Sequence, residues 1–352
     1  RGSFCAEVEQ EQERLRETFA NRRTEELVAY ESACANAFDL SWQEQELAKP
    51  EFLGARQFDK VDLAVLREYI DWTPFFHAWG LKGIYPKIFT KEGVGKVAED
   101  LYEQGQKALD TIIKQGVLEP RGLYGFFPAA SLGQEIAVYA SEERSVSSHQ
   151  FYCLRQQKKF GNAEHFYSLA DFIAPKDSGC SDYLGAFVVS TGHGLDDFVA
   201  FHEKKHDDYS AIMAKVLADR LAEAFAEYAH QQARLACGFG VGENLTHEQL
   251  IAEAYQGIRP APGYPACPDH TLKFALFDLL EAEKKIDVRL TEHASMWPAA
   301  SVSGFYFNHP KSRYFNVGPI ARDQIEAYAK HRQIHIEEAE RWLEPQLAYE
   351  PS

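Results

Sequence analysis

Apolar residues recur at helical spacing through several long segments of this chain. In the longest segment, 196–236, they form a stripe made of Ile212, Val216, Leu217, Leu221 and Phe225. Residues three and four apart share one face of a helix, so the stripe predicts one long helix with this face in the core. Further helices are expected at 6–20, 91–116, 247–255, 270–284, 321–331 and 336–343, with two short helices at 62–79.

Short β-prone runs lie between these helices. Two of them, 123–127 and 136–139, fall within a stretch from Gly122 to about Leu154 that charged turns interrupt. Other strands are expected at 183–190, 287–291 and 301–307. Strands and helices do not alternate regularly, as they would in a doubly wound sheet. The pattern predicts an α+β fold, with a mostly antiparallel sheet and long flanking helices, and not a Rossmann-type methyltransferase fold.

The composition is that of an ordinary globular protein, with 45% hydrophobic and 26% charged residues in 352. The formal net charge of −16 argues against nucleic acid and anionic membranes as partners, because binding phosphates requires Lys and Arg. We expect a cytoplasmic protein with reduced thiols, since no apolar run could span a bilayer, no signal-peptide pattern is present and the six cysteines are scattered.

The segment 259–270, RPAPGYPACPDH, has the most distinctive composition in the chain. Its four prolines each fix φ and remove a backbone donor, so the loop should be stiff and can join neither a helix nor a central strand. Arg259 at its start could bind a ligand carboxylate through two parallel hydrogen bonds, with Tyr264 at the turn. A rigid surface loop without a ligand is the alternative interpretation.

Two other patterns suggest chemistry but have weaker support. His202-Glu-Lys-Lys-His206 has the spacing that places two zinc ligands on one helix face, which leaves a zinc hydrolase as an alternative. The lysines between the histidines and the lack of a third ligand favour a solvated helix face. A glycine-rich segment, Gly238-Phe-Gly-Val-Gly242, follows a predicted helix rather than a strand. We therefore expect it to end that helix and not to form a nucleotide-binding loop. No metal site and no catalytic nucleophile is expected.

Four segments, in order along the chain, share the motifs of one known family. They are YIDWTPFF at 69–76, ADFIAP at 170–175, the Arg-x-x-x-Gly-Tyr of 259–264, and WPAASVSGFY at 297–306 followed by HPKSRYF at 309–315. This set resembles the activation domain of cobalamin-dependent methionine synthase, which binds S-adenosylmethionine. The matches run from about 56 to about 345. We therefore expect an N-terminal helical extension at 1–55 and a single activation domain at 56–352.

The resemblance implies a set of residues that contact S-adenosylmethionine. Arg259 would bind the carboxylate and Asp71 the α-ammonium, although Asp71 could instead be the N-cap of a helix beginning at Trp72. The remaining members of the set are Ala261, Gly263, Tyr264, Tyr314, Phe315 and, more weakly, Glu223. Phe315 could equally be a core residue, and Glu223 could be a solvated helical residue.

The resemblance also implies partners. The chain lacks the family's Asp-x-His-x-x-Gly cobalamin motif, so the corrin would be held by a cobalamin-binding domain outside this chain. A flavodoxin-type donor would reduce cob(II)alamin, and S-adenosylmethionine would then methylate the cobalt. The isolated chain should not turn over. Arg155, Lys158 and Lys159 form a candidate basic patch for docking the donor, as do Lys204 and Lys205. A free-standing S-adenosylmethionine-dependent methyltransferase is the other alternative.

Overall fold

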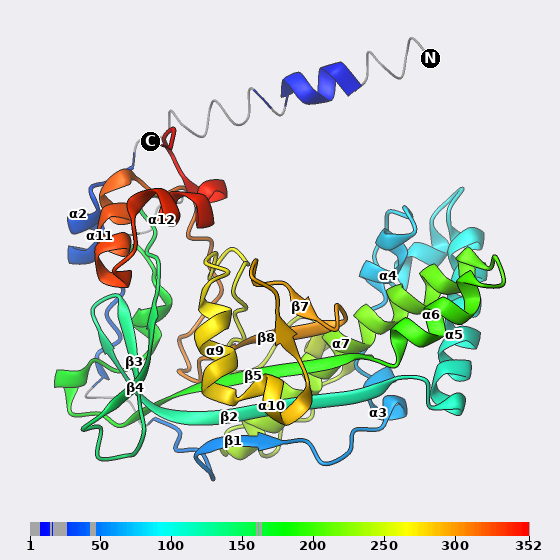
Figure 1. The fold of residues 1–352 in the computed structure, drawn as a ribbon, viewed down its shortest axis with the longest axis horizontal. Helices are drawn as coiled ribbons and strands as arrows, with labels where there is room; N and C mark the ends of the chain where they lie inside the picture. The colour runs from blue at the N-terminus through cyan, green and yellow to red at the C-terminus, as the bar shows by residue number, and fades with distance from the viewer. Residues whose placement is uncertain are drawn as a thin grey trace.

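A six-stranded sheet, antiparallel at every pairing, forms the centre of the structure (Figure 1). The structure is a computed structural model that describes residues 8–14, 16, 27–42, 47–159, 161 and 164–351. The strands of this sheet are β1 (Gly54–Gln57), β2 (Glu119–Leu132), β3 (Glu135–Tyr139), β4 (Ser147–Tyr152), β5 (Asp182–His193) and β8 (Ser301–Tyr306). Two short strands, β6 (Arg289–Leu290) and β7 (Met296–Trp297), pair separately.

The long strand β2 organises the sheet. One of its sides pairs with β1 in the middle of the strand and with β3 at its end, while β5 pairs along its other side. The resulting order is β4-β3-β2-β5-β8, so β8 lies at one edge. Neighbouring strands are joined by hairpins or by helical excursions, which confirms the predicted α+β class with a mostly antiparallel sheet.

Helices cover both faces and both ends of this sheet. In chain order they are α2 (Tyr30–Ala35), α3 (Leu63–Arg67), α4 (Thr73–Ala78), α5 (Gly95–Gln115), α6 (Leu195–Glu203), α7 (Asp208–Ala236), α8 (His247–Ile251), α9 (Leu272–Leu280), α10 (Ala282–Ile286), α11 (Arg322–Arg332) and α12 (Ile336–Trp342). Short 3-10 turns occur at η2 (Lys87–Thr90), η3 (Leu169–Phe172), η4 (Lys176–Ser178) and η5 (Glu344–Gln346).

Alternation along β5 divides the interior into two cores. Successive side chains of a strand point to opposite faces. Phe187 and Val189 therefore join the core beneath α3, α4, α5 and α7, whereas Ala186 and Val188 join the core beneath α9 and α10. All four side chains are fully buried, and β5 is buried on both faces along its whole length, which explains why its central residues 184–189 are apolar instead of alternating.

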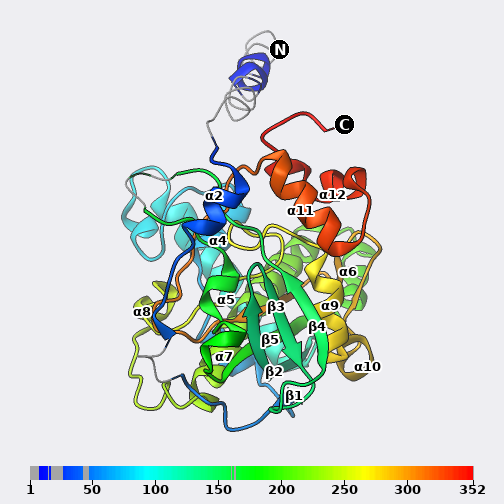
Figure 2. The same ribbon diagram turned by 90° about the vertical axis from the view of Figure 1, so that its left-hand side faces the viewer.

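A third, smaller core lies at the other end of the sheet. There α11 and α12 pack on the end of β4, with Tyr152, Ile325 and Leu343 among its buried residues (Figure 2). The N-terminal segment 27–42 joins this end, because Tyr30 N donates to the Asp323 carboxylate at 2.7 Å. The boundary predicted between an N-terminal extension (1–55) and the activation domain (56–352) falls inside β1, which belongs to the sheet. This division of the chain stays a prediction.

The structure corrects the single long helix predicted at 196–236. The chain breaks between α6 and α7, where His206 has φ +56° and the Asp207 side chain accepts from Ser210 N at 3.1 Å. This new N-cap starts α7 in a new direction. Ile212, placed in the buried stripe, is 49% exposed, while Leu217, Leu221 and Phe225 are fully buried.

Other boundaries also differ from the predictions. The run of short strands at 122–154 is one fourteen-residue strand, β2, followed by β3 and β4. The helix at 270–284 is two helices, divided at Glu281 with φ +54°. The predicted helix at 247–255 stops at Ile251, and the strand at 287–291 shortens to β6. Residues 8–14 and 16 are helical, and the rest of the helix predicted at 6–20 lies outside the described residues.

Candidate functional site

Two adjoining cavities lie between α7 and the proline-rich loop. The first, of about 280 Å³, lies between the short helices, α7 and α8; the second, of about 400 Å³, lies between α7, the loop and β8. Glu223 and Arg259 line both cavities. Asp71 lines the first, whereas Ala261, Tyr264, Tyr314 and Phe315 line the second. Seven of the eight residues predicted as ligand contacts therefore lie around one continuous site.

Arg259 lies where the two cavities meet. Its Nη1 is 2.7 Å from Glu227 Oε2 and also donates to the Tyr255 hydroxyl, while its Nη2 is 3.5 Å from Glu253 Oε1. Burial alone would lower the pKa of the Arg259 guanidinium, but the Glu227 carboxylate together with Tyr255, Tyr314 and Glu253 outweighs burial, and the pKa is raised. Arg259 is thus held as a cation in the cavity wall, which suits a group that binds carboxylates.

The loop that carries Arg259 is fixed by its backbone to the edge strand β8. Ile258 exchanges two hydrogen bonds of 3.0 Å with Phe307, and the Pro260 carbonyl accepts from Phe305 N at 3.0 Å. The loop therefore continues the sheet for a short distance before it turns. Its stiffness comes from this pairing as well as from its prolines.

Gly263 does not line either cavity but makes the turn of the loop possible. It has φ +101°, and a Cβ at this position would lie 2.1 Å from the ring of His270. Its N–H donates to the Cys267 carbonyl at 2.7 Å, and Cys267 N donates to the Tyr264 carbonyl at 2.8 Å. Only glycine combines this backbone conformation with so close a neighbour.

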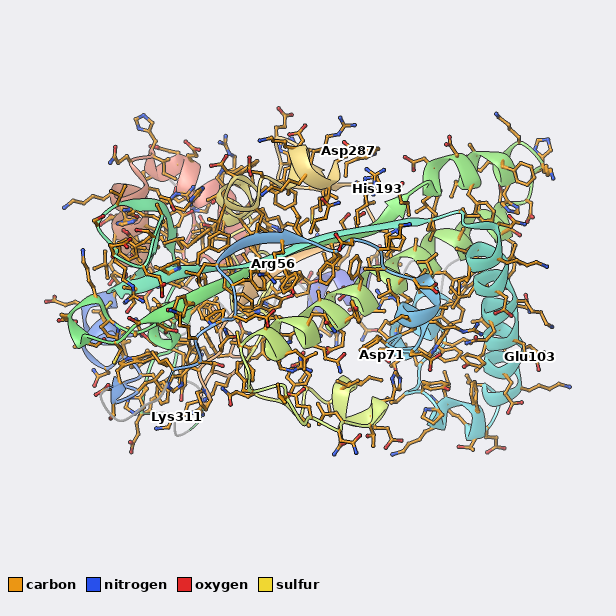
Figure 3. The ribbon with its side chains drawn as sticks, turned by 90° about the horizontal axis from the view of Figure 1, so that it is seen from below. Arg56, Asp71, Glu103, His193, Asp287 and Lys311 are labelled. Carbon is orange, nitrogen blue, oxygen red and sulfur yellow. The ribbon has the colours of Figure 1, made fainter. Side chains whose placement is uncertain are left out.

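Asp71 makes a hydrogen bond at the start of a helix, as its alternative role predicted, but from the residue before the N-cap. The helix α4 has Trp72 as its N-cap, and Asp71 Oδ1 accepts from Thr73 N at 2.9 Å. This hydrogen bond fixes the carboxylate while the side chain still lines the first cavity, close to α7 (Figure 3). One residue therefore combines a local structural contact with a place in the site.

The aromatic residues of the second cavity differ in their burial. Tyr264 is 59% exposed and Tyr314 is 42% exposed. The Tyr314 hydroxyl accepts from Arg259 N at 3.0 Å, and burial of this hydroxyl raises the pKa of Tyr314 to about 12. Phe315 also packs beside Tyr167 and Phe172, with ring centroids 5.8 and 6.3 Å away. Phe315 therefore serves both as core and as cavity wall.

Several lining residues were not predicted. Glu227 lies one helical turn after Glu223, so the i, i+4 spacing on α7 could have indicated it. Glu253 carries a pKa raised by burial, although Arg259 opposes this shift. The other lining residues that sequence reasoning missed are Tyr69, Pro74, Phe187, Arg220, Ala224, His247, Leu250, Ile251, Pro260, Pro265, Ala266 and Val302.

The zinc alternative loses its helical geometry. His202 belongs to α6 and bonds through Nδ1 to Asp207 at 3.0 Å, whereas His206 lies beyond the end of that helix. Among the described residues, no group of three or more His, Cys, Asp or Glu could hold a metal ion. Gly238, with φ +81°, follows the end of α7 as a helix-terminating glycine, as predicted. Within the same described residues, none of the helices has the length and apolar character of a membrane span.

The candidate basic patch is wrong in one of its three members. Arg155 is 1% exposed, and its guanidinium binds the Asp171 carboxylate at 2.5 and 2.8 Å. Because Arg155 is buried and its guanidinium is taken up by Asp171, Gln134 and the Phe166 carbonyl, it has no role on the surface. Lys159 is exposed and Lys158 is partly buried, so a basic cluster without Arg155 stays a prediction.

Comparison with known proteins identifies the family of the chain. Residues 62–333 match the family described as "Vitamin B12 dependent methionine synthase, activation domain". The chain belongs to this family. A crystal structure of the MetH reactivation domain bound to AdoHcy shares 47% sequence identity with it, at a TM-score of 0.89, over 92% of this chain and 99% of that one.

The assignment to the activation domains confirms the resemblance found in the sequence. This chain is accordingly a domain of a cobalamin-dependent methionine synthase, which is a methyltransferase. Its sheet and helices are those of the solved reactivation domain and not of a Rossmann-type methyltransferase. The zinc hydrolase and the free-standing methyltransferase are no longer needed to explain the sequence.

Proposed function

We propose that this domain binds S-adenosylmethionine across the two adjoining cavities and presents its methyl group for reactivation of the synthase. The observation that carries this proposal is Arg259, a paired guanidinium shared by both cavities. The similar reactivation domain was solved with AdoHcy, the product that S-adenosylmethionine leaves after losing its methyl group.

The charges of the lining residues support a cationic ligand. Four carboxylates line the two cavities (Asp71, Glu223, Glu227 and Glu253) against two guanidinium groups (Arg220 and Arg259), an excess of two negative charges. S-adenosylmethionine carries one carboxylate, one ammonium and one sulfonium, so its net charge is positive. Opposite net charges favour binding and favour this ligand over its neutral product.

Each part of the ligand has a matching group. Arg259 binds the carboxylate, and the Asp71 carboxylate, whose Oδ1 is fixed by Thr73 N, accepts from the ammonium. Tyr264 presents a ring beside the sulfonium, since aromatic faces attract cations. Tyr314, Phe315 and Ala261 contact the adenosine in the second cavity, with Glu223 between the two parts. Gly263 acts by shaping the turn.

Cobalamin, held on a separate domain, supplies the cobalt that accepts the methyl group. The residues of this chain bind and orient S-adenosylmethionine, and effective molarity is the source of the rate gain. The electron would come from a flavodoxin-type donor, in a cytoplasmic setting. We expect the isolated domain to bind S-adenosylmethionine without turning it over.

The proposal is tested by titration calorimetry of the purified domain with S-adenosylmethionine, in a buffer that contains a metal chelator. We expect saturable binding at one site per chain. Asp71→Asn should weaken binding, since a neutral amide attracts the ammonium less than a carboxylate does. Absence of binding by the folded wild-type domain would refute the proposed function.

A further inference from the structure

Glu227 is a buried carboxylate beneath the ligand-binding arginine. It lies in the middle of α7 and is 7% exposed. Its Oε2 is 2.7 Å from Arg259 Nη1 and accepts from the Tyr255 hydroxyl at 3.0 Å. Two polar groups therefore meet at this oxygen, one from the segment just after α8 and the other from the start of the loop.

A second buried guanidinium lies on the other side of Glu227. Arg234 is fully buried, and its Nη1 is 3.8 Å from Glu227 Oε1. Its Nε donates to both oxygens of Glu243, at 3.1 and 3.0 Å, and its guanidinium lies 3.9 Å over the Tyr255 ring. Arg234 is thus fixed in place by Glu243 and Tyr255, and it places a positive charge beside Glu227 Oε1.

Burial of a carboxylate is costly unless cations and donors surround it. Glu227 meets this condition at Oε2 through Arg259 and Tyr255, whereas Oε1, which has no hydrogen-bond partner among the described residues, has the Arg234 guanidinium 3.8 Å away. Its position lets it transmit the rigidity of the buried core to the side chain in the cavity wall. Glu227 and Tyr255 at Nη1, together with Glu253 at Nη2, contact two nitrogens of the Arg259 guanidinium and so restrict its plane.

The contacts of Arg259 leave one edge of its guanidinium for a ligand. Glu227 and Tyr255 both engage Nη1, and Glu253 approaches Nη2 only to 3.5 Å. Within the described part of the chain, Nε makes no hydrogen bond with a protein acceptor. A guanidinium binds a carboxylate best through two parallel N–H groups, and fixing its plane in advance reduces the entropy lost on binding.

We propose that Glu227 is a positioning residue, which orients Arg259 toward the carboxylate of the ligand without touching the ligand itself. The inference rests on the proposed function. It predicts that the effect of Glu227 on binding depends on two features: a carboxylate on the ligand and the guanidinium of Arg259. If Glu227 had a purely structural role, its replacement would weaken the binding of all ligands alike. If Glu227 competed with the ligand for Arg259, its replacement would strengthen the binding of S-adenosylmethionine.

The test compares S-adenosylmethionine with its decarboxylated analogue on Glu227→Gln by titration calorimetry. We expect affinity for S-adenosylmethionine to fall about tenfold or more, the scale of losing a partner that orients a ligand-binding group. Affinity for the decarboxylated analogue should fall much less, because Glu227 acts on it only as one of the four carboxylates that line the cavities. In an Arg259→Ala background, Glu227→Gln should likewise cause a much smaller further loss, because the group that it orients is gone.

Glu135→Gln is the matched control. Glu135 is also 7% exposed, its Oε2 is 2.8 Å from His331, and it lines neither cavity. This control should bind both ligands as the wild type does. Melting temperature is measured for every variant, and Glu227→Asp, which keeps the charge but shortens its reach, replaces the amide variant if the latter does not fold.

Each other outcome overturns the inference. Unchanged or tighter binding of S-adenosylmethionine by a folded Glu227 variant would mean that Glu227 does not orient Arg259. Equal losses for both ligands would assign Glu227 a structural role only. Failure of the wild-type domain to bind S-adenosylmethionine would instead refute the proposed function, and is distinguishable because it appears before any substitution.

Discussion

Arg259→Ala is the substitution with the best-defined consequence for ligand binding. Truncating one partner of a buried, hydrogen-bonded charge pair costs about 2–5 kcal/mol. The Arg259 side chain is 19% exposed, so water screens part of the interaction with the ligand. We therefore expect a loss in the lower part of that range, about 2–3 kcal/mol. At about 1.4 kcal/mol for each factor of ten, S-adenosylmethionine should bind roughly 30-fold to 150-fold more weakly.

Calorimetry of three proteins with two ligands isolates this effect. Wild type, Arg259→Ala and Arg259→Lys are each titrated with S-adenosylmethionine and with 5′-methylthioadenosine, which lacks the carboxylate and the ammonium. Arg259→Lys keeps the charge but not the two parallel donors, so its affinity should be intermediate. Neither variant should alter binding of 5′-methylthioadenosine. Wild-type affinity of Arg259→Ala for S-adenosylmethionine would refute the carboxylate contact.

Three further substitutions test the loop, the buried histidine and the buried arginine. Gly263→Ala should lower both melting temperature and ligand affinity, because the new Cβ would lie 2.1 Å from the ring of His270. The control Gly133→Ala, at φ +69° with nothing within 4 Å, introduces backbone strain alone. Equal losses of melting temperature in the two variants would exclude the clash with His270. Burial lowers the pKa of His309 from 6.5 to about 4, so the unfolded chain binds more protons between these values and stability falls as pH drops through them. His309→Gln should flatten that slope in urea unfolding, and an unchanged slope would assign it to other groups. Arg155→Met should cost about 3–5 kcal/mol of stability, because it leaves the Asp171 carboxylate buried and unpaired. The control Lys159→Glu should change stability by no more than about 0.5 kcal/mol. Similar melting temperatures for the two variants would place Arg155 at the surface.

Much of the site could be predicted because its chemistry is local in sequence. The prolines, Arg259 and Tyr264 lie within one short segment, and proline and glycine restrict the backbone wherever they occur. The fold class followed from the irregular order of helical and β-prone segments. Asp71 and Tyr314 came from family motifs, since their own surroundings in the sequence do not distinguish a ligand contact from a cap or a core residue.

What could not be predicted depends on contacts distant in sequence. Arg155 looks like a surface cation beside two lysines, and only its pairing with Asp171 buries it. The break before α7 depends on the Asp207 cap, which competes with a continuous helical pattern. Glu227 resembles any solvated helical glutamate until Arg234 and Arg259 are brought to either side of it.

The pairing of the proline-rich loop with β8 also protects the sheet from self-association. An edge strand offers unpaired N–H and C=O groups to any other chain, and native proteins block such edges with proline or with a covering segment. Ile258 and Pro260 cover β8 at Phe305 and Phe307, and all four prolines of the loop lack the N–H that a further strand would need. The residues that make the loop rigid for binding therefore also end the sheet. Replacing them would both loosen the site and expose an edge that favours aggregation.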